Sequence, residues 1–391
     1  MGVHDTPHAN RLHIAIYGKR NSGKSTLLNQ LLHQEVSLVS DIPGTTTDPV
    51  VKAMELAGIG PVVFYDTAGF DDIGMLGEQR NQRTRKMIDQ TDIAILLFHE
   101  QSIEEELTWL KELENKHIPV LGIWNSKGQN LSPPKAFHDN IKHRLLLDIH
   151  ESTTLEKVRE ALLTLLPQEE TPSVVAHLIH PNDIVLLVMP QDIQAPKGRL
   201  ILPQVQVIRE LLDYHCIVQC CSPATMTQTL DALKKAPNLI ICDSQVFHEV
   251  YAIKPIESKL TSFSVLFARH KGDIDLFVEG AHHLESLKKD AHILIAEACA
   301  HAPTSEDIGR VKLPAMLRKR FGNELRITIV NGTDFPLDLS PYDMIIHCGA
   351  CMFTRTYVLN RVASVKAQQV PMSNYGIVIA WLQGILDKII V

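Results

Sequence analysis

The 391-residue chain lacks the charge balance and the aromatic content that mark nucleic-acid-binding proteins. Its 38 Lys and Arg residues are outnumbered by 45 Asp and Glu residues, which gives a formal net charge of -7. Neutralising a phosphate backbone requires the opposite balance. Aromatic residues make up only 5% of the chain, so a basic, aromatic-rich RNA surface is not expected. We therefore expect no nucleic-acid partner.

The sequence also lacks a leading signal peptide and an apolar run long enough for a membrane span. The apolar stretch from Gly376 to Val391 is interrupted by Gln383, Asp387 and Lys388, and a span needs about 20 residues. We expect a docked amphipathic helix there, and no membrane partner. Seven cysteines in a chain without a signal peptide predict reduced thiols in the cytoplasm. Such cysteines either bind metal or lie in a core.

The length of the chain and its 45% hydrophobic residues are sufficient for several hydrophobic cores, and we expect three domains of the α/β class. In residues 1–168, short β-branched runs alternate with helix-period segments, which predicts βαβ units and a mostly parallel sheet. The prolines at 167 and 172 predict a linker. A smaller α/β unit is expected over 169–264. A third domain, over 265–391, has expected strands near Ile293 and Ile327.

The strongest local motif is the sequence Gly18-Lys19-Arg20-Asn21-Ser22-Gly23-Lys24-Ser25, which follows a strand-like run and precedes a helix-like one. This is the phosphate-binding loop of nucleotide hydrolases in its required context. Its glycines let backbone N–H groups face the phosphates, Lys24 adds positive charge and Ser25 is a Mg²⁺ ligand. The sequence therefore predicts a nucleotide site with Mg²⁺.

Two further segments supply the remaining phosphate-side groups. Thr45 and Thr46 lie in a loop over 41–48 whose hydroxyls suit Mg²⁺ while the γ-phosphate is present. Asp66 and Gly69 belong to Asp66-Thr67-Ala68-Gly69, which offers a carboxylate to the Mg²⁺ water shell and an amide to the γ-phosphate. Three elements in this order predict hydrolysis.

These motifs resemble the GTPase domains of the TrmE and Era group over roughly residues 12–168. The resemblance implies a K⁺ ion held by Asn21 and a catalytic glutamate at Glu78. Phe70 stands where other GTPases carry a water-orienting glutamine, so this domain is expected to need help in positioning water. The expected catalytic residues are Lys24, Thr46, Asp66, Gly69 and Glu78.

The segment that reads guanine departs from that group. Its NKxD motif is here Asn125-Ser126-Lys127-Gly128, so the base-reading aspartate is absent and guanine preference is expected to be weakened. GTP remains the expected nucleotide. The expected nucleotide-binding residues are Gly18, Asn21, Ser22, Gly23, Lys24, Ser25, Thr26, Thr45, Thr46, Asp66, Gly69 and Asn125.

A metal site is predicted near the C-terminus. Cys299 and His301 stand 45 residues before the sequence His347-Cys348-Gly349-Ala350-Cys351, and strand-like runs precede both halves. Both halves are therefore expected at one edge of a sheet. Three thiolates favour either an iron-sulfur cluster or zinc with a histidine, and the spacing does not decide between them. On a 4Fe-4S cluster, the candidates for the fourth iron are His301, His347 and Glu297. The other cysteines, Cys216, Cys220, Cys221 and Cys242, are expected in cores.

This cysteine pattern behind a TrmE-like GTPase domain, together with the segment from Ala195 to Gln206, resembles the HydF family of FeFe-hydrogenase maturation factors over nearly the whole chain. The resemblance implies a homodimer formed through the middle domain and a 4Fe-4S cluster on Cys299, Cys348 and Cys351. It also implies a scaffold that receives the precursor of the di-iron subcluster from the radical-SAM enzymes HydE and HydG and delivers it to apo FeFe-hydrogenase.

Two other function classes are weighed against this hypothesis. One is a TrmE- or Era-like GTPase with a structural zinc that acts in RNA modification or ribosome assembly, and the acidic balance speaks against it. The other is a redox-sensing switch whose cluster regulates hydrolysis and builds nothing. Metal content separates the first from the HydF hypothesis, and cluster-dependent hydrolysis rates would support the second.

Overall fold

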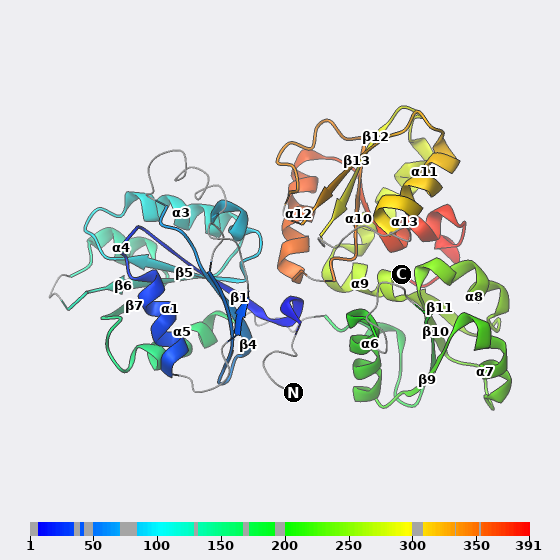
Figure 1. Ribbon diagram of the computed structural model, residues 1–391, viewed down its shortest axis with the longest axis horizontal. Coiled ribbons are helices and arrows are strands. Elements are labelled where there is room, and N and C mark those ends of the chain that lie inside the picture. Colours follow the sequence, from blue (N-terminus) through cyan, green and yellow to red (C-terminus); the bar gives the residue numbers. More distant parts are fainter. Residues whose placement is uncertain are drawn as a thin grey trace. The chain divides into compact units, whose positions relative to one another are not determined.

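The computed structural model describes residues 7–34, 40–42, 50–70, 84–128, 132–166, 172–191, 200–298, 308–332, 334–351 and 353–391. The chain divides into two compact units, Met1–Glu170 and Thr171–Val391, which are described separately (Figure 1). The division falls inside the stretch over 166–172 in which a linker is expected.

The first unit contains one seven-stranded sheet in the order β2-β3-β4-β1-β5-β6-β7. β2 pairs antiparallel with β3, and β3 pairs antiparallel with β4. The pairs that join β4, β1, β5, β6 and β7 are parallel, so the sheet is mostly parallel, as the sequence predicts. The strands are β1 (Leu12–Gly18), β2 (Ser40–Ile42), β3 (Val50–Leu56), β4 (Gly60–Asp66), β5 (Ile93–Phe98), β6 (Val120–Asn125) and β7 (His143–Leu147). The helices are α1 (Lys24–Gln34), α3 (Glu104–Asn115), α4 (Lys135–Asn140) and α5 (Thr154–Leu165).

Both faces of this sheet are covered, because β5 and β6 are buried along their whole length. One core includes Trp109 of α3 and Phe137 of α4, and the other includes Leu27 of α1 and Val158 of α5. A parallel sheet buried on both faces leaves its carboxyl edge as the place where loops can bind ligands. The phosphate-binding loop leaves β1 at this edge.

The second unit contains two four-stranded sheets that are parallel throughout, in the orders β11-β10-β8-β9 and β13-β12-β14-β15. The strands are β8 (Ile184–Val188), β9 (Ile217–Cys221), β10 (Leu239–Cys242), β11 (Lys259–Ser262), β12 (His292–Glu297), β13 (Arg326–Asn331), β14 (Met344–His347) and β15 (Met372–Asn374). The helices are α6 (Leu202–Asp213), α7 (Met226–Ala232), α8 (Phe247–Ile253), α9 (Phe263–Lys271), α10 (Ile274–His283), α11 (Leu313–Phe321), α12 (Arg355–Gln368) and α13 (Tyr375–Leu382).

The two sheets of the second unit share one hydrophobic core, which includes Ile240 of one sheet and Ile345 of the other. Helix α9 lies between the sheets (Figure 1). It contributes Val265 to this shared core. Its Phe267 belongs to a second core, on the opposite face of the β11-β10-β8-β9 sheet. The expected domain boundary between 264 and 265 therefore falls inside a helix. At the chain end, the Ile390 N–H donates to the Leu260 carbonyl at 2.8 Å, so the last residues lie along β11.

The apolar C-terminal stretch differs from its expected form. Helix α13 is buried on all sides from Tyr375 to Ala380, so it is a core helix and not an amphipathic one. The sequence pattern misled because the polar residues Gln383, Asp387 and Lys388 all follow the helix. Among the described residues, no helix combines the length and the apolar character that crossing a membrane would require.

Candidate nucleotide and metal sites

The phosphate-binding loop from Gly18 to Ser25 connects β1 to α1 and depends on its two framing glycines. Gly18 has φ +152° and Gly23 has φ +105°. A Cβ atom on Gly18 would stand 2.9 Å from the Leu97 carbonyl oxygen, and one on Gly23 would stand 2.8 Å from Nδ2 of Asn125. Any side chain at these positions would push the loop away from the neighbouring strands.

Lys24 is buried at the centre of this loop. Its Nζ donates to the Gly18 carbonyl at 2.9 Å and to the Lys19 carbonyl at 2.7 Å. The ammonium group thus holds the loop wrapped around the first turn of α1, where helix N–H groups and the helix dipole also favour an anion. The arrangement fits a bound phosphate group.

The Mg²⁺ side of the site is formed by Ser25 and Asp66. The Ser25 hydroxyl donates to Oδ2 of Asp66 at 2.5 Å, because β1 and β4 are parallel neighbours. Burial raises the pKa of Asp66, while Ser25 and then Lys24 act in the opposite direction. Its other oxygen, Oδ1, is buried and has no hydrogen-bond partner among the described groups. A buried carboxylate oxygen left in this state is costly, and a hydrated cation would satisfy it.

The residues after Asp66 are anchored in the core. The Thr67 hydroxyl donates to the Ile16 carbonyl at 2.7 Å, and the Phe70 ring stacks on Trp109 with a centroid distance of 5.2 Å. Phe70 is buried, so its side chain packs into the unit and cannot orient a water molecule. Gly69 is buried as well. The expected residues Thr45, Thr46 and Glu78 lie outside the described part of the chain.

The remaining loop residues differ in exposure. Asn21 is exposed and adopts φ +55° at the apex of the loop, and its role in holding K⁺ stays a prediction. The Ser22 side chain is buried against Gly18. Thr26 is half-buried in the first turn of α1.

Asn125 braces the loops of the nucleotide site. Its Nδ2 donates to the Ser22 carbonyl at 3.0 Å, and its Oδ1 accepts from the N–H groups of Lys127 at 3.2 Å and Ile149 at 3.5 Å. Both ends of this buried amide are therefore engaged by protein. The structure gives Asn125 a positioning role between the phosphate-binding loop and the loops after β6 and β7.

The two halves of the cysteine pattern follow neighbouring strands, as expected. β12 and β14 are parallel, with Ala296 opposite His347. The N–H of Ala298, the residue immediately before Cys299 in the sequence, donates to Sγ of Cys348 at 3.0 Å. Cys299 and His301 lie outside the described residues. Within the described part, no three His, Cys, Asp or Glu side chains are grouped as a metal site.

The loop that carries Cys348 and Cys351 is held from several directions. Sγ of Cys348 also accepts from the Ala350 N–H at 3.4 Å, and Ala350 adopts φ +48°. The buried ammonium of Lys271 donates to the carbonyls of Ala350 at 2.8 Å and Phe353 at 2.7 Å. N–H groups aimed at sulfur favour the thiolate that metal binding requires. Burial raises the pKa of the Cys351 thiol, and Lys271 acts in the opposite direction.

The structure does not favour His347 as a fourth ligand. Its Nδ1 donates to the Cys348 carbonyl at 2.7 Å, and its Nε2 accepts from Nη1 of Arg361 at 2.9 Å. Burial, and then Arg361, lower the pKa of His347 to about 3. The ring is therefore neutral, and neither nitrogen is free to bind a metal.

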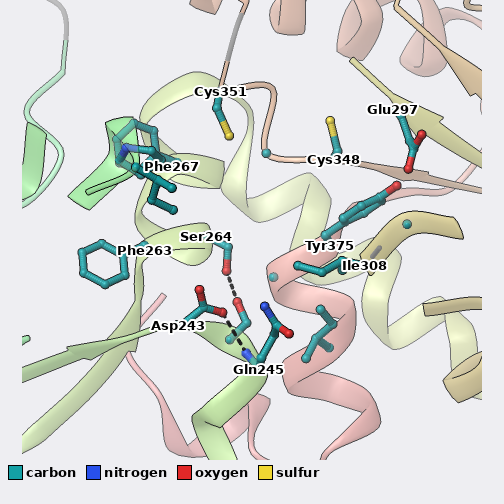
Figure 2. Close-up of a pocket in the computed structure, with 17 residues that line it drawn as sticks. Asp243, Gln245, Phe263, Ser264, Phe267, Glu297, Ile308, Cys348, Cys351 and Tyr375 are labelled. Atoms are coloured by element: carbon teal, nitrogen blue, oxygen red, sulfur yellow. Dashed lines mark hydrogen bonds between the residues drawn. The ribbon is translucent and has the colours of Figure 1, made fainter. Parts of the chain in front are cut away.

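Glu297 is engaged as well. Its Oε2 forms an ion pair with Nε of Arg310 at 3.0 Å. Figure 2 shows its carboxylate next to the Tyr375 hydroxyl, and a Cβ atom on Gly309 would stand 2.2 Å from Oε1 of Glu297 and from the hydroxyl oxygen of Tyr375. Glu297 thus forms part of a wall against which only glycine fits.

A cavity of about 230 Å³ adjoins the cysteine loop. Cys348 and Cys351 line one side of it, and Ser264 of α9 lines another (Figure 2). Gly376 of α13 is also among its lining residues. The Ser262 side chain caps α9 and the Asn374 side chain caps α13, so both helices begin at this cavity. Two helix N-termini beside a pair of thiols favour a ligand that carries negative charge.

Sequence reasoning missed the residues that support the cysteine loop and misplaced one cysteine. Lys271 lies 79 residues from Ala350, and no local pattern signals such a contact. Asn374, whose Nδ2 donates to the Cys348 carbonyl at 3.2 Å, could have been suspected only as a helix cap. Cys216 and Cys242 are buried, as expected, but Cys220 is exposed because β9 is an edge strand.

Comparison with protein families matches the whole arrangement in three parts. The model of the hydrogen maturase F dimerization domain matches residues 174–272, and that of the hydrogen maturase F tetramerization domain matches residues 275–391. A model described as 50S ribosome-binding GTPase matches residues 13–126. The two hydrogen maturase F models together span more than half of the chain.

The curated relatives are GTPases that match part of the chain. The tRNA modification GTPase MnmE of Caldicellulosiruptor saccharolyticus is 32% identical over 153 residues, which are 39% of this chain and 33% of that protein. MnmE of Nitrosomonas europaea is 35% identical over 153 residues, or 38% of this chain and 34% of that one. The GTPase Der of Wolinella succinogenes is 45% identical over 141 residues, or 34% of this chain and 29% of that one. This chain thus spans about a third of the length of these relatives.

The matches agree with the geometry of the first unit, where a wrapped phosphate-binding loop faces a Mg²⁺ carboxylate. That unit is a GTPase domain. The two matches in the second unit cover both of its sheets. The chain therefore belongs to the hydrogen maturase F (HydF) family, with a GTPase domain of the TrmE/Era type at its N-terminus.

Proposed function

We propose that this chain is a cytoplasmic maturation factor that holds a 4Fe-4S cluster on Cys299, Cys348 and Cys351 and carries the di-iron subcluster precursor to apo FeFe-hydrogenase. The observation that carries the proposal is the hydrogen bond from the Ala298 N–H to Sγ of Cys348 at 3.0 Å. It brings the residue before Cys299 into contact with a second cysteine of the pattern. A thiolate that accepts backbone N–H bonds is a typical iron-sulfur ligand environment.

The engaged side chains around the loop support a cluster with one open position. A cluster on three cysteines would leave its fourth iron without a thiolate. Of the candidate ligands, His347 and Glu297 already have partners in Arg361 and Arg310, which leaves His301 or an incoming ligand for that iron. When bound, the cluster would supply an iron that accepts an exchangeable ligand. In this proposal the cavity of about 230 Å³ beside Cys348 and Cys351 receives the precursor as cargo.

The GTPase domain times the exchange of partners in this proposal. Lys24, Ser25 and Asp66 would hold GTP and Mg²⁺, and Asn21 would hold K⁺. Thr45, Thr46 and Gly69 would respond to the γ-phosphate, and Glu78 would act on the attacking water. A loop ordered only by the γ-phosphate is a two-state element. Its state would decide whether the chain retains or releases HydE, HydG and the hydrogenase.

Homodimerisation is proposed through the middle of the chain, at the edge strand β9. The proposed domain division is 1–168, 169–264 and 265–391, with its second boundary inside α9. β9 is the outer strand of its sheet, and Ile217 at its start is 50% exposed. Two further apolar residues on the adjacent helix α6, Val205 and Leu212, are 48% and 46% exposed. An exposed apolar edge strand is a ready site for pairing with a second copy of the chain.

The decisive experiment combines metal content with function. The full-length chain would be reconstituted anaerobically with iron and sulfide, examined by electron paramagnetic resonance, and tested for activating apo-hydrogenase after incubation with HydE and HydG. We expect a 4Fe-4S signal and activation, both lost in Cys348→Ser and kept in Cys216→Ser, which changes a cysteine outside the loop and outside β9. Stoichiometric zinc with no iron would overturn the proposal and favour a TrmE- or Era-like GTPase with a structural zinc.

The dimer has a separate test. Ile217→Lys places a charge on the exposed edge of β9 and is expected to shift the sedimentation coefficient toward that of a smaller species. Ile256→Lys is the matched control, because Ile256 is 97% exposed and lies outside β9. Equal sedimentation of both variants and the wild type would show that β9 is not the interface.

A further inference from the structure

The segment of the GTPase domain that reads the base lacks an aspartate at position 128. Gly128 stands where the NKxD motif carries the aspartate that accepts hydrogen bonds from guanine. As a glycine, residue 128 has no side chain and cannot supply a carboxylate. It is exposed and has φ +70°. GTPase domains of this type select guanine. If the present domain does so too, another residue must provide the hydrogen-bond acceptor for the base.

A carboxylate stands beside Gly128. Asp148 follows β7, and β7 pairs with β6 so that Leu147 lies opposite Asn125. The Ser126 N–H donates to the Leu147 carbonyl at 3.0 Å, which fixes the two loops against each other. A Cβ atom built on Gly128 would stand 3.5 Å from Oδ2 of Asp148. One oxygen of Asp148 therefore reaches the space from which an aspartate at 128 would present its own carboxylate.

The two oxygens of Asp148 have different surroundings. Oδ1 accepts from the His150 N–H at 3.0 Å, which fixes the orientation of the carboxylate. Oδ2 is the oxygen that faces Gly128. The side chain is half-buried, so an acceptor is held ready at the surface of the site without being enclosed by protein.

The position of Asp148 relative to the phosphate-binding loop matches the place of a base. The Mg²⁺ side of the loop is marked by Asp66 at the end of β4, on one side of β1, whereas β6 and β7 lie on the other side of β1. The Ile149 side chain reaches Gly23, with 2.8 Å between its Cδ1 and a Cβ built on Gly23. A nucleotide whose γ-phosphate points toward Asp66 therefore has its base toward the loops after β6 and β7.

We propose that Asp148 is the guanine-reading residue of this chain and replaces the aspartate that is absent at position 128. Its carboxylate accepts the N–H groups at N1 and N2 of guanine, an edge that adenine does not offer. The proposal rests on the nucleotide site at residues 18–25. It differs from a purely structural role, in which Asp148 would only form the turn before α5 through His150.

The test exploits the difference between a carboxylate and an amide. Asp148→Asn keeps Oδ1 as the acceptor for the His150 N–H but presents an N–H donor toward Gly128. Guanine, with an amino group at C2, then loses a partner, whereas xanthine, with a carbonyl at C2, gains one. Competition binding would be measured on the full-length chain with Mg²⁺ and GTP, xanthosine triphosphate or ATP.

We expect the wild type to prefer GTP to ATP, and Asp148→Asn to lose GTP affinity by about 10- to 100-fold while its affinity for xanthosine triphosphate rises, since a charge-assisted hydrogen bond contributes about that factor. Asp148→Ala should lose GTP affinity without gaining xanthosine triphosphate. Adding Gly128→Asp to Asp148→Ala should restore GTP preference. The control is Glu156→Gln, an exposed acid in the first turn of α5, which should change neither affinity.

Two outcomes would overturn the proposal. The first is an Asp148→Asn variant that binds GTP as the wild type does and xanthosine triphosphate no better. In that case GTP binding through residues 18–25 would stand and only the base contact would be refuted. The second is a wild type that binds GTP and ATP equally, since no residue would then read guanine. Thermal unfolding of each variant would show whether a lost affinity reflects the contact or a loss of folding.

Discussion

The nucleotide site and the cysteine site are built on the same plan but from different amounts of local sequence. Each lies at the carboxyl edge of a parallel sheet, after neighbouring strands: β1 and β4 in one case, and β12 and β14 in the other. The phosphate-binding loop supplies most of its own contacts within eight consecutive residues, such as Lys24 to Gly18 and Lys19. The cysteine loop depends on residues far away in the sequence, such as Lys271 and Asn374.

A local sequence motif is sufficient to predict a site only where the loop makes its contacts within the motif. In the phosphate-binding loop, the glycines, the lysine and the start of the helix lie within eight consecutive residues. The role of each residue can therefore be predicted from the motif. For the cysteine loop, the sequence motif predicts the metal ligands but not the distant residues that hold the loop in place. The support decides whether the thiols are held in place before metal arrives, so it determines how tightly the site binds.

Removing one site and measuring the other tests whether the two sites are independent. Lys24→Ala is expected to lower GTP hydrolysis by about 100-fold or more, because the ammonium acts on the transferred phosphoryl group. Its iron content after anaerobic reconstitution should remain unchanged. Cys348→Ser is expected to lose most of the iron and to keep hydrolysis within about twofold of the wild type. Hydrolysis rates and iron content would be measured on both variants.

The control for this pair is Cys216→Ser, which should change neither quantity because Cys216 lies outside both sites and outside β9, and a serine can keep its hydrogen bond to the His180 carbonyl. A large loss of hydrolysis in Cys348→Ser would contradict the separation of the two sites. It would instead support a redox switch in which the cluster regulates the GTPase domain.

The second prediction concerns the outside support of the cysteine loop. Lys271→Met removes a buried ammonium and leaves the carbonyls of Ala350, Cys351 and Phe353 without their donor. Loss of a buried charged donor is expected to cost about 3 kcal/mol of unfolding free energy. The retained iron should dissociate faster in the presence of a chelator, while GTP hydrolysis is expected to stay unchanged. Urea unfolding and chelator kinetics would measure the two effects.

Lys235→Met is the matched control, since Lys235 is an exposed lysine outside the loop. A Lys271→Met variant as stable as this control, with unchanged iron release, would mean that the loop holds itself as the phosphate-binding loop does. The contrast between the two sites would then disappear.

The sequence predicted the parts of the fold that depend on periodicity. The strands β1, β4, β5 and β6 lie where short β-branched runs occur, because strands buried on both faces must be continuously apolar. Helix α9 was not predicted, since residues from Phe263 to Lys271 are buried on nearly every side and show no helical alternation. The same reason explains the mistaken amphipathic helix at α13.

The candidate sites show the same limit at the level of single residues. His347 looked like a ligand because it precedes Cys348, but its nitrogens are occupied by the Cys348 carbonyl and by Arg361, a residue of α12. Asn125 was expected to bind the nucleotide, which stays a prediction, and the structure shows that it also contacts Ser22 and Ile149. In each case the residue type indicated polar chemistry, and only the packing showed with which partner.

The smallest predicted effect concerns whether the phosphate-binding loop depends on a residue outside it. Beneath that loop, Nζ of Lys19 lies 3.5 Å from Oε2 of Glu106, a residue of α3 that is fully buried. Burial raises the pKa of Glu106 from 4.5 to about 7. Between these values the unfolded chain has already lost the proton that the folded chain still holds, so the folded state is progressively destabilised as pH rises through this window.

Glu106→Gln keeps the shape of the side chain and removes the charge, while Lys19 retains Glu100 and the Ser102 carbonyl as partners. Relative to the wild type, the variant should therefore gain stability as pH rises, by on the order of 2 kcal/mol between about pH 5 and pH 8. Urea unfolding at both pH values would measure this difference, with the exposed neighbour variant Glu105→Gln as control. An equal gain in the two variants would show that titration of the buried Glu106 carboxylate does not contribute to the pH dependence of stability. A gain confined to Glu106→Gln, with GTP affinity unchanged, would show that the loop keeps its form without the acid beneath it.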